Sequence, residues 1–428
     1  MVKFNFNPGD KIEITTKKEA LSGLFMPSKE NTFILKLDNG YNLGIDKKNI
    51  KKVKLLSKYK EKKPKSSKVK QNSKLPTITI LHTGGTIASK VDYETGGVIA
   101  RFSPEELLEM FPELKKIVNL KSRLVSNMWS EDLNFQHYNL LAKEVEKEVK
   151  AGADGVIITH GTDTLHYTSS ALAFILENLK IPVILVGSQR SSDRGSSDAA
   201  LNLICACNFI ANSKFQDVAI CMHSSMEDES CYILPATKSR KLHSSRRDAF
   251  KAINTDPIAL VDKQGKIEYS QKVKQKKGKL NLRLFKEVKV GILKAHPNML
   301  SKEVSFYKDY DGLILEGTGL GHFPINKTDS STTENEKVFT ELKKLSKKIP
   351  VVMTSQCIFG RINMNVYTTG RKLQEIGVLG NGLDMTTETA FIKLAWLLSN
   401  FKKQDVFELI SENISNEINE RIKDDFLE

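Results

Sequence analysis

The sequence predicts an α/β protein with two parallel-sheet domains, preceded by a small β-barrel. Three observations lead to this prediction. From residue 77 onward, β-rich runs alternate with helical patterns, which is typical of a parallel sheet covered by helices. Residues 9–54 instead hold short, closely spaced β-runs with little helix, and a lysine-rich stretch separates the two patterns. At 428 residues the chain is also too long for one core.

The N-terminal segment has the pattern of a small all-β domain. Residues 11–15 and 33–37 form β-patterned runs, and Asp38-Asn39-Gly40 follows the second of them. An Asn-Gly pair between β-runs is a strong hairpin signal, because both residues tolerate the positive φ of a tight turn. We therefore expect a β-barrel domain over residues 1–57.

A basic segment follows this domain. Thirteen lysines lie between Lys47 and Lys74, with Glu61 as the single acid. The centre of the segment also contains proline and serine and has no helical or strand periodicity. We expect a basic linker over residues 58–75, either a solvated tether or one that also touches RNA phosphate.

The rest of the chain divides into two α/β domains. A polar stretch, Asp262 to Lys279, separates them, so we expect one domain over 76–270, a connector over 271–287 and a second domain over 288–428. In the first domain the expected strands are 77–81, 155–159 and 182–187, and the expected helices are 104–110, 134–150 and 169–179. In the second the expected strands are 288–293, 312–315 and 350–354, and the expected helix is 386–398.

Composition and charge exclude several classes of protein. The chain is 40% hydrophobic and 27% charged, and none of its apolar runs approaches the roughly 20 residues of a membrane span. The N-terminus lacks the apolar stretch of a secretory signal, so a cytoplasmic location is expected. The five cysteines are odd in number and form no Cys-x-x-Cys pair, so we expect reduced core residues and no metal site.

Two threonine-rich runs stand at the ends of predicted buried strands. Thr83-Gly84-Gly85-Thr86 follows the strand at 77–81, and Thr159-His160-Gly161-Thr162-Asp163-Thr164 ends the strand at 155–159. Parallel sheets bind their ligands at the carboxyl edge of the strands, so the two runs are expected to meet at one crevice. Their glycines would let backbone amides approach a developing oxyanion.

The same region supplies groups for proton transfer. A threonine hydroxyl is a poor nucleophile without a neighbouring base, and Thr162, Asp163, Lys238 and Lys241 are the available members of a proton-accepting chain. Each piece also has a simpler explanation. The Gly-Gly pair can be an ordinary turn, and Asp163 can be a helix cap.

The two threonine runs resemble the signature motifs of the bacterial-type L-asparaginase and glutaminase family, and both are intact. The resemblance implies an asparaginase-like fold and hydrolysis of a side-chain amide through an acyl-enzyme, with release of ammonia. By the same resemblance Thr86 is the nucleophile, and Thr162 and Asp163 belong to the proton-handling set. Lys241 matches the family lysine better than Lys238 does, because its interval to Phe250 resembles the family pattern.

Other matching positions lie around the expected substrate. Tyr93, in a glycine-flanked loop, resembles the tyrosine of a mobile lid. Ser130 and Glu131 resemble the segment that binds the substrate's α-carboxylate and α-amino group, and Gly85 and Gly161 match substrate-binding glycines. Glu131 stands where some relatives have glutamine, and the preference between glutamine and asparagine stays open.

The N-terminal domain points to a more specific family. Residues 23–28, 37–42, 243–250 and 356–367 are similar to GatD, the D-type chain of the archaeal glutamyl-tRNA(Gln) amidotransferases. The resemblance implies a glutaminase subunit without a cofactor of its own. Its ammonia would go to GatE, the E-type chain of the same enzymes, which uses ATP and Mg to amidate glutamyl-tRNA(Gln).

The resemblance also implies an assembly, a homodimer of this chain within a heterotetramer, with no membrane contact. Two alternatives remain. The chain can be a stand-alone cytoplasmic L-asparaginase with an accessory barrel, or a basic RNA-binding module on an inactive hydrolase fold.

Overall fold

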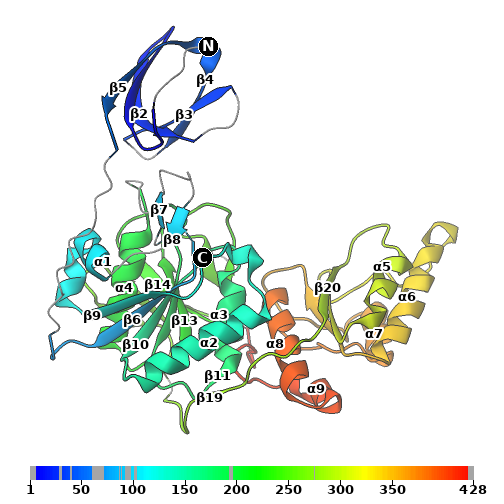
Figure 1. Ribbon diagram of the computed structural model, residues 1–428. Helices are drawn as coiled ribbons and strands as arrows, with labels where there is room; N and C mark the ends of the chain where they lie inside the picture. The colour runs from blue at the N-terminus through cyan, green and yellow to red at the C-terminus, as the bar shows by residue number, and fades with distance from the viewer. Residues whose placement is uncertain are drawn as a thin grey trace.

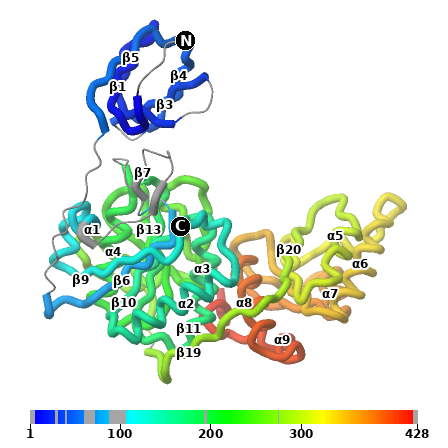
Figure 2. The backbone as a smooth tube through the Cα atoms, in the orientation of Figure 1, coloured from blue at the N-terminus to red at the C-terminus, as the bar shows by residue number. Residues whose placement is uncertain are grey.

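The computed structural model describes residues 6–27, 31–38, 41–59, 72–85, 87, 89–91, 98–100, 104–191, 196–273 and 275–422. They form a small all-β domain and two α/β domains (Figure 1). Figure 2 follows the backbone through the same domains from blue to red. Of the basic linker, residues 60–71 lie outside the described residues.

The N-terminal domain is a five-stranded antiparallel sheet in the order β4-β3-β2-β1-β5. It curls around a core of Ile12, Ile14, Phe33, Leu35 and Ile45, as expected of a small barrel. β3 and β4 pair from Thr32↔Asp46 to Lys36↔Asn42, which confirms the predicted hairpin. The strands are β1 Lys11–Thr16, β2 Ala20–Met26, β3 Thr32–Lys36, β4 Asn42–Asp46 and β5 Ile50–Ser57.

The first α/β domain is built on an eight-stranded sheet in the order β18-β17-β14-β13-β12-β10-β6-β9. β9, β6, β10, β12 and β13 run parallel, whereas β14, β17 and β18 are antiparallel additions. The expected parallel sheet is therefore a mixed one. Its strands are β6 Thr77–His82, β9 Asn119–Leu124, β10 Gly155–Thr159, β12 Val183–Val186, β13 Val218–His223, β14 Ser230–Pro235, β17 Ala259–Asp262 and β18 Ile267–Tyr269.

Helices cover both faces of this sheet because its parallel strands are apolar on both sides. Along β6, Leu81 packs with α2 and α3, whereas Ile78 and Ile80 pack with α1 and α4. The helix expected at 169–179 begins four residues earlier and ends at Ile175. The helices are α1 Pro104–Met110, α2 Phe135–Lys150, α3 Leu165–Ile175 and α4 Ala199–Asn212.

Short two-stranded ladders complete this domain. β15 Ser239–Lys241 pairs with β16 Phe250–Ala252, and β7 Ser89–Val91 pairs with β8 Val98–Ala100. β11 Leu176–Glu177 pairs with β19 Asn281–Leu282, so the expected connector contributes a strand.

The second α/β domain has a three-stranded parallel sheet in the order β20-β21-β22. One face packs on α5, α6 and α7, and the other on α8, which also packs on α3 of the first domain. Figure 1 shows α8 between the two domains. The elements are β20 Val290–Lys294, α5 Ser301–Ser305, β21 Gly312–Gly317, α6 Thr333–Ser346, β22 Val351–Ser355, α7 Thr368–Glu375, α8 Thr387–Asn400 and α9 Lys403–Leu409.

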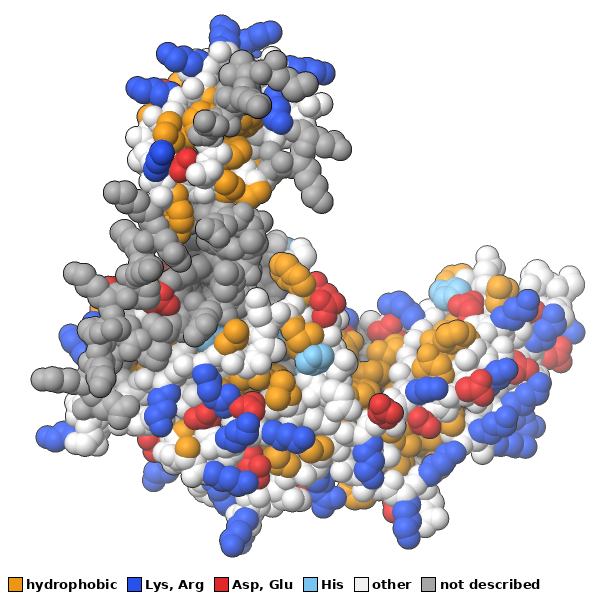
Figure 3. Space-filling view, viewed as in Figure 1, with side chains coloured by type: hydrophobic (Ala, Val, Ile, Leu, Met, Phe, Trp, Pro, Cys, Tyr) orange, Lys and Arg blue, Asp and Glu red, His pale blue; other side chains and the backbone are white. Residues whose placement is uncertain are grey.

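The cysteines and the charges are distributed as follows. Cys205, Cys207, Cys221 and Cys231 are buried free thiols, but Cys357 is exposed, so its assignment to the core is wrong. Figure 3 shows lysine and arginine side chains scattered over the visible face of all three domains. In the part of the chain that the structure describes, no helix is long and apolar enough to cross a membrane.

Candidate active site

The two threonine-rich runs lie next to each other. β6 and β10 are parallel neighbours with Thr159 opposite His82, so both strands end at the same edge of the sheet. Thr83 donates both its N–H and its hydroxyl to Thr159 O, at 3.2 and 2.8 Å. The expected meeting of the two strand ends is confirmed.

Glycine permits the close approach of these segments. Gly85 has φ +82°, and a Cβ there would come within 2.7 Å of Gly161 N. A Cβ on Gly161 would in turn lie 2.9 Å from Ser130 Cβ. Thr164 Oγ1 donates to Ser130 O at 2.6 Å, which fixes the segment that contains Ser130 against the second threonine-rich run.

Lys241 reaches this edge from β15. Its Nζ donates to Thr162 Oγ1 and to Asp163 Oδ1, both at 2.8 Å. The Lys241 side chain is only 10% exposed, whereas that of Asp163 is 68% exposed. The lysine therefore brings a half-buried ammonium to a hydroxyl and to a carboxylate that still faces solvent.

Lys238 points elsewhere. It is buried, and its Nζ donates to Asp384 Oδ2 at 2.8 Å. Lys238 lies in the bend between β14 and β15, so its side chain does not follow the alternation of the strand that carries Lys241. Of the two lysines, Lys241 alone contacts the threonine run.

The simpler explanation of Asp163 as a helix cap is not what the structure has. Thr164 is the N-cap of α3, and Asp163 faces Lys241. The N-terminus of α3 nevertheless lies at the site, because its N-cap Thr164 directly follows Asp163, and the N-terminus of a helix carries a partial positive charge.

The other predicted residues are placed as follows. Ser130 is buried and donates to Glu131 Oε2 at 3.3 Å, and Glu131 itself is exposed. Thr86 and Tyr93 lie outside the described residues. The structure thus brings together Gly85, Ser130, Gly161, Thr162, Asp163 and Lys241.

Sequence reasoning missed His166, which lies with His160 in a buried polar layer beside the site. His160 is fully buried and contacts Gly161 O at 2.7 Å and Thr168 Oγ1 at 2.8 Å. Burial lowers the pKa of His160 to about 4. Burial, followed by the charge of Arg240, lowers the pKa of His166 to about 3. The signal that was available is the pair itself, because His160 directly follows β10 and His166 lies in the first turn of α3.

These two rings predict a loss of stability in acid. Above pH 6.5 both rings are neutral, folded or unfolded. Below pH 6.5 the two histidines become protonated in the unfolded chain. In the folded chain they stay neutral until the pH falls to about 4 for His160 and about 3 for His166. The free energy of unfolding should fall by up to about 1.4 kcal/mol per pH unit for each ring.

Thermal unfolding midpoints between pH 7 and pH 4.5 measure this effect. His160→Gln should have a flatter pH dependence than the unmodified chain. His243→Gln is the control, because that residue is exposed. An equal slope in His160→Gln and the unmodified chain would contradict the assignment.

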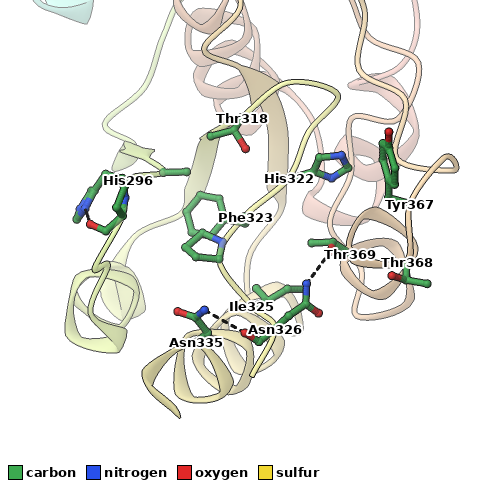
Figure 4. A pocket seen from close by; sticks show the side chains of 13 residues that line it. His296, Thr318, His322, Phe323, Ile325, Asn326, Asn335, Tyr367, Thr368 and Thr369 are labelled. Atoms are coloured by element: carbon green, nitrogen blue, oxygen red, sulfur yellow. Dashed lines mark hydrogen bonds between the residues drawn. The ribbon is translucent and has the colours of Figure 1, made fainter. Parts of the chain in front are cut away.

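A separate cavity of about 570 Å³ lies in the second domain, lined only by residues between 295 and 369. Figure 4 shows the rings of His322 and Tyr367 there, and their centroids are 5.2 Å apart. The cavity contains none of the predicted site residues. Among the described residues no group of three or more His, Cys, Asp or Glu is arranged to bind a metal ion.

The chain matches three family models in succession. Residues 6–56 match the GatD N-terminal domain, 77–275 the N-terminal asparaginase domain, and 289–409 the glutaminase/asparaginase C-terminal domain.

Among curated proteins, the chain is similar to the GatD subunit of the glutamyl-tRNA(Gln) amidotransferase of Methanococcus maripaludis strain C6. The two are 43% identical over 426 residues, which are 97% of this chain and 98% of the relative. The corresponding protein of Pyrococcus abyssi is 41% identical over 429 residues, 97% of this chain and 95% of the relative.

Solved structures share the fold over about four fifths of this chain. The thermostable L-asparaginase from Thermococcus kodakarensis superposes with a TM-score of 0.71 at 30% identity, covering 81% of this chain and all of that one. L-asparaginase I from Vibrio cholerae superposes with a TM-score of 0.69 at 27% identity, covering 81% of this chain and 99% of that one.

Proposed function

Because the chain belongs to the GatD family of glutamyl-tRNA(Gln) amidotransferase subunits, we propose that it hydrolyses glutamine to glutamate and ammonia for a tRNA-dependent amidotransferase. The observation that carries this proposal is the match to the GatD N-terminal domain ahead of an asparaginase-type pair of domains. A stand-alone L-asparaginase has no need of that domain, and the solved asparaginases cover only 81% of this chain.

The chemistry begins with a threonine hydroxyl. We assign the attack on the side-chain carbonyl carbon to Thr86, with backbone amides at Gly85 and Gly161 facing the developing oxyanion. The hydroxyl proton passes to the proton-handling set and then to the leaving amine, the C–N bond breaks, and ammonia departs. Water then attacks the resulting ester, releases glutamate and restores the hydroxyl.

Thr162, Asp163 and Lys241 form the proton-handling set. The two 2.8 Å contacts of Lys241 Nζ support this role, because groups that pass a proton to one another must lie within hydrogen-bonding distance. The carboxylate of Asp163 orients the ammonium and balances its charge. Ser130 and Glu131 lie on the segment that packs against the second threonine-rich run, where the ammonium and carboxylate of an amino acid would bind. Tyr93 is proposed as the lid residue.

The ammonia has a defined use in this proposal. In water at pH 7 ammonia is mostly protonated and not nucleophilic, so a second site that consumes it at once is an advantage. We propose that GatE is this partner. It would use ATP and Mg to activate the glutamate on glutamyl-tRNA(Gln), and this chain would need no cofactor.

The assembly and location are also part of the proposal. We propose a homodimer of this chain with one partner bound to each copy, giving a heterotetramer in the cytoplasm. The predicted domain limits, 1–57, 76–270 and 288–428 with linkers 58–75 and 271–287, stay predictions. Contact between the basic linker and tRNA also stays a prediction.

Co-expression with GatE tests the proposal. We expect a stable heterotetramer by native mass spectrometry, and formation of Gln-tRNA(Gln) from Glu-tRNA(Gln), ATP and glutamine. The chain alone should hydrolyse glutamine slowly, and partner with Glu-tRNA(Gln) should raise that rate. Fast turnover of asparagine by the chain alone, independent of tRNA, would favour the stand-alone asparaginase instead.

A further inference from the structure

Lys241 depends for its position on three residues that precede its strand. β15 has only three residues and pairs with an equally short β16, and Arg240 of β15 forms an ion pair with Glu388 of α8 at 2.9 Å. Residues 236–238 connect β15 to β14 of the main sheet. A shift of these three residues would therefore shift β15 and, with it, Lys241.

The first domain holds this connection from one side. Ala236 O accepts hydrogen bonds from Ser169 Oγ at 2.7 Å and from Ser170 Oγ at 3.0 Å, both on α3. These hydroxyls are buried. The same helix begins at the threonine run, so α3 relates the two parts of the site.

The second domain holds the next residue. Thr389, near the start of α8 and 1% exposed, donates its hydroxyl to Thr237 O at 2.7 Å. Ser170 Oγ lies 3.1 Å from the Thr389 hydroxyl. α8 thus reaches across the domain interface to the backbone that leads to Lys241.

The segment after α9 completes the attachment. Thr237 Oγ1 donates to Ser415 O at 3.0 Å. Lys238 Nζ donates to Asp384 Oδ2 at 2.8 Å and to Glu417 O at 3.3 Å. Both members of the Lys238–Asp384 ion pair are buried, at 3% and 0% side-chain exposure. All three residues from 236 to 238 are therefore held by buried hydrogen bonds from elements far away in the sequence.

We propose that Thr389 and Asp384 of the second domain are positioning residues for Lys241. By fixing Thr237 and Lys238 they set the distance from Lys241 Nζ to Thr162 and Asp163. This inference rests on the proposed role of Lys241 in proton transfer.

The physical reason lies in the exposure of Asp163. Because the Asp163 side chain is 68% exposed, water competes for its hydrogen bonds. The contact between Asp163 and Lys241 therefore depends on where the protein holds Lys241 Nζ. A displacement of about 1 Å caused by a change away from the reacting atoms can lower a rate about 100-fold. Bonds that only stabilise the domain interface would have no such effect on the rate.

Thr387 provides a matched control on the same helix. It is also a buried threonine, 5% exposed, but its hydroxyl contacts Thr354 Oγ1 at 2.9 Å and Glu316 Oε1 at 3.3 Å, both within the second domain. Thr387→Val and Thr389→Val therefore remove the same group from similarly buried places. They differ in the partner that loses its hydrogen bond. Thr389 donates to the backbone of Thr237, which precedes the strand of Lys241, whereas the partners of Thr387 lie within the second domain.

The experiment measures glutamine hydrolysis by the chain with GatE and Glu-tRNA(Gln), together with thermal unfolding. We expect Thr389→Val to lower kcat about tenfold with little change in KM, and to shift the pH dependence of kcat. Thr389→Ser, which keeps the hydroxyl, and Thr387→Val should both stay within about twofold of the unmodified chain.

The outcomes separate the positioning role from the proposed function. If Thr389→Val and Thr387→Val lower kcat equally, or if Thr389→Val leaves kcat and its pH dependence unchanged, the positioning role is wrong. Should Thr389→Val unfold, Thr389→Ala leaves room for water at Thr237 O and is measured in its place, with Thr387→Ala as control. Failure of the unmodified complex to hydrolyse glutamine would contradict the proposed function instead.

Discussion

Lys241→Met is expected to lower the rate of glutamine hydrolysis by about 10²- to 10⁴-fold, the range that general acid–base groups contribute. Methionine keeps most of the length and the apolar stem of the side chain, so the space that the 10% exposed Lys241 side chain occupies stays filled. Only the ammonium is lost, and with it both 2.8 Å contacts, to Thr162 and to Asp163. The measurement is the initial rate of ammonia release at saturating glutamine, with GatE and Glu-tRNA(Gln) present.

Lys251→Met is the matched control for this variant. Lys251 lies on β16, the strand paired with β15, and its ammonium bonds to Ser224 O at 3.3 Å without touching the threonine run. The Lys251→Met variant should keep its activity within about twofold of the unmodified chain, since Lys251 is 40% exposed and its ion pair with Asp248, at 3.7 Å, is of the kind that contributes little. Retention of more than about a tenth of the activity by Lys241→Met would contradict the assigned role, since general acid–base groups typically contribute at least about 10²-fold.

Lys238→Met would be a poor control. Removing this lysine leaves the carboxylate of Asp384 buried with no countercharge in the ion pair, which costs about 3–5 kcal/mol of stability. A loss of activity in that variant would reflect unfolding as well as chemistry. The two members of the pair have to be replaced together.

Much of the site follows from the sequence because it depends on local patterns. The apolar runs before Thr83 and Thr159 predict buried parallel strands, and neighbouring parallel strands necessarily end at one edge. Lys241 and Lys238 are told apart only by spacing in the sequence, whereas their opposite directions in the structure make the distinction physical.

Other features depend on contacts that no local pattern contains. α3 was expected to begin at Ser169, but it begins at Leu165 and is buried on nearly every side, so it shows no amphipathic period to mark its ends. The antiparallel strands β14, β17 and β18 extend a sheet that was expected to be parallel. Glu417 lies in the largely polar run 411–419, yet it is fully buried against Lys393, a contact that no local pattern marks.

Thr86→Val is expected to abolish amidation that depends on glutamine, by at least about 10³-fold, because valine keeps the branched shape and removes the attacking oxygen. Thr162→Val should have a similar effect. The Thr162 methyl lies close to Gly187, where an added Cβ would come within 2.7 Å of it, so valine preserves this packing. In both variants the partner's chemistry should be untouched, since the proposal places it in another protein chain.

The central claim is that this chain makes ammonia and that another site uses it. The most direct test is the rate of Gln-tRNA(Gln) formation by the Thr86→Val complex, with glutamine or with ammonium chloride as the nitrogen source. We predict no product from glutamine and a rate close to that of the unmodified complex from ammonium chloride. A folded Thr86→Val complex that ammonium fails to rescue, or that still uses glutamine, would contradict the account.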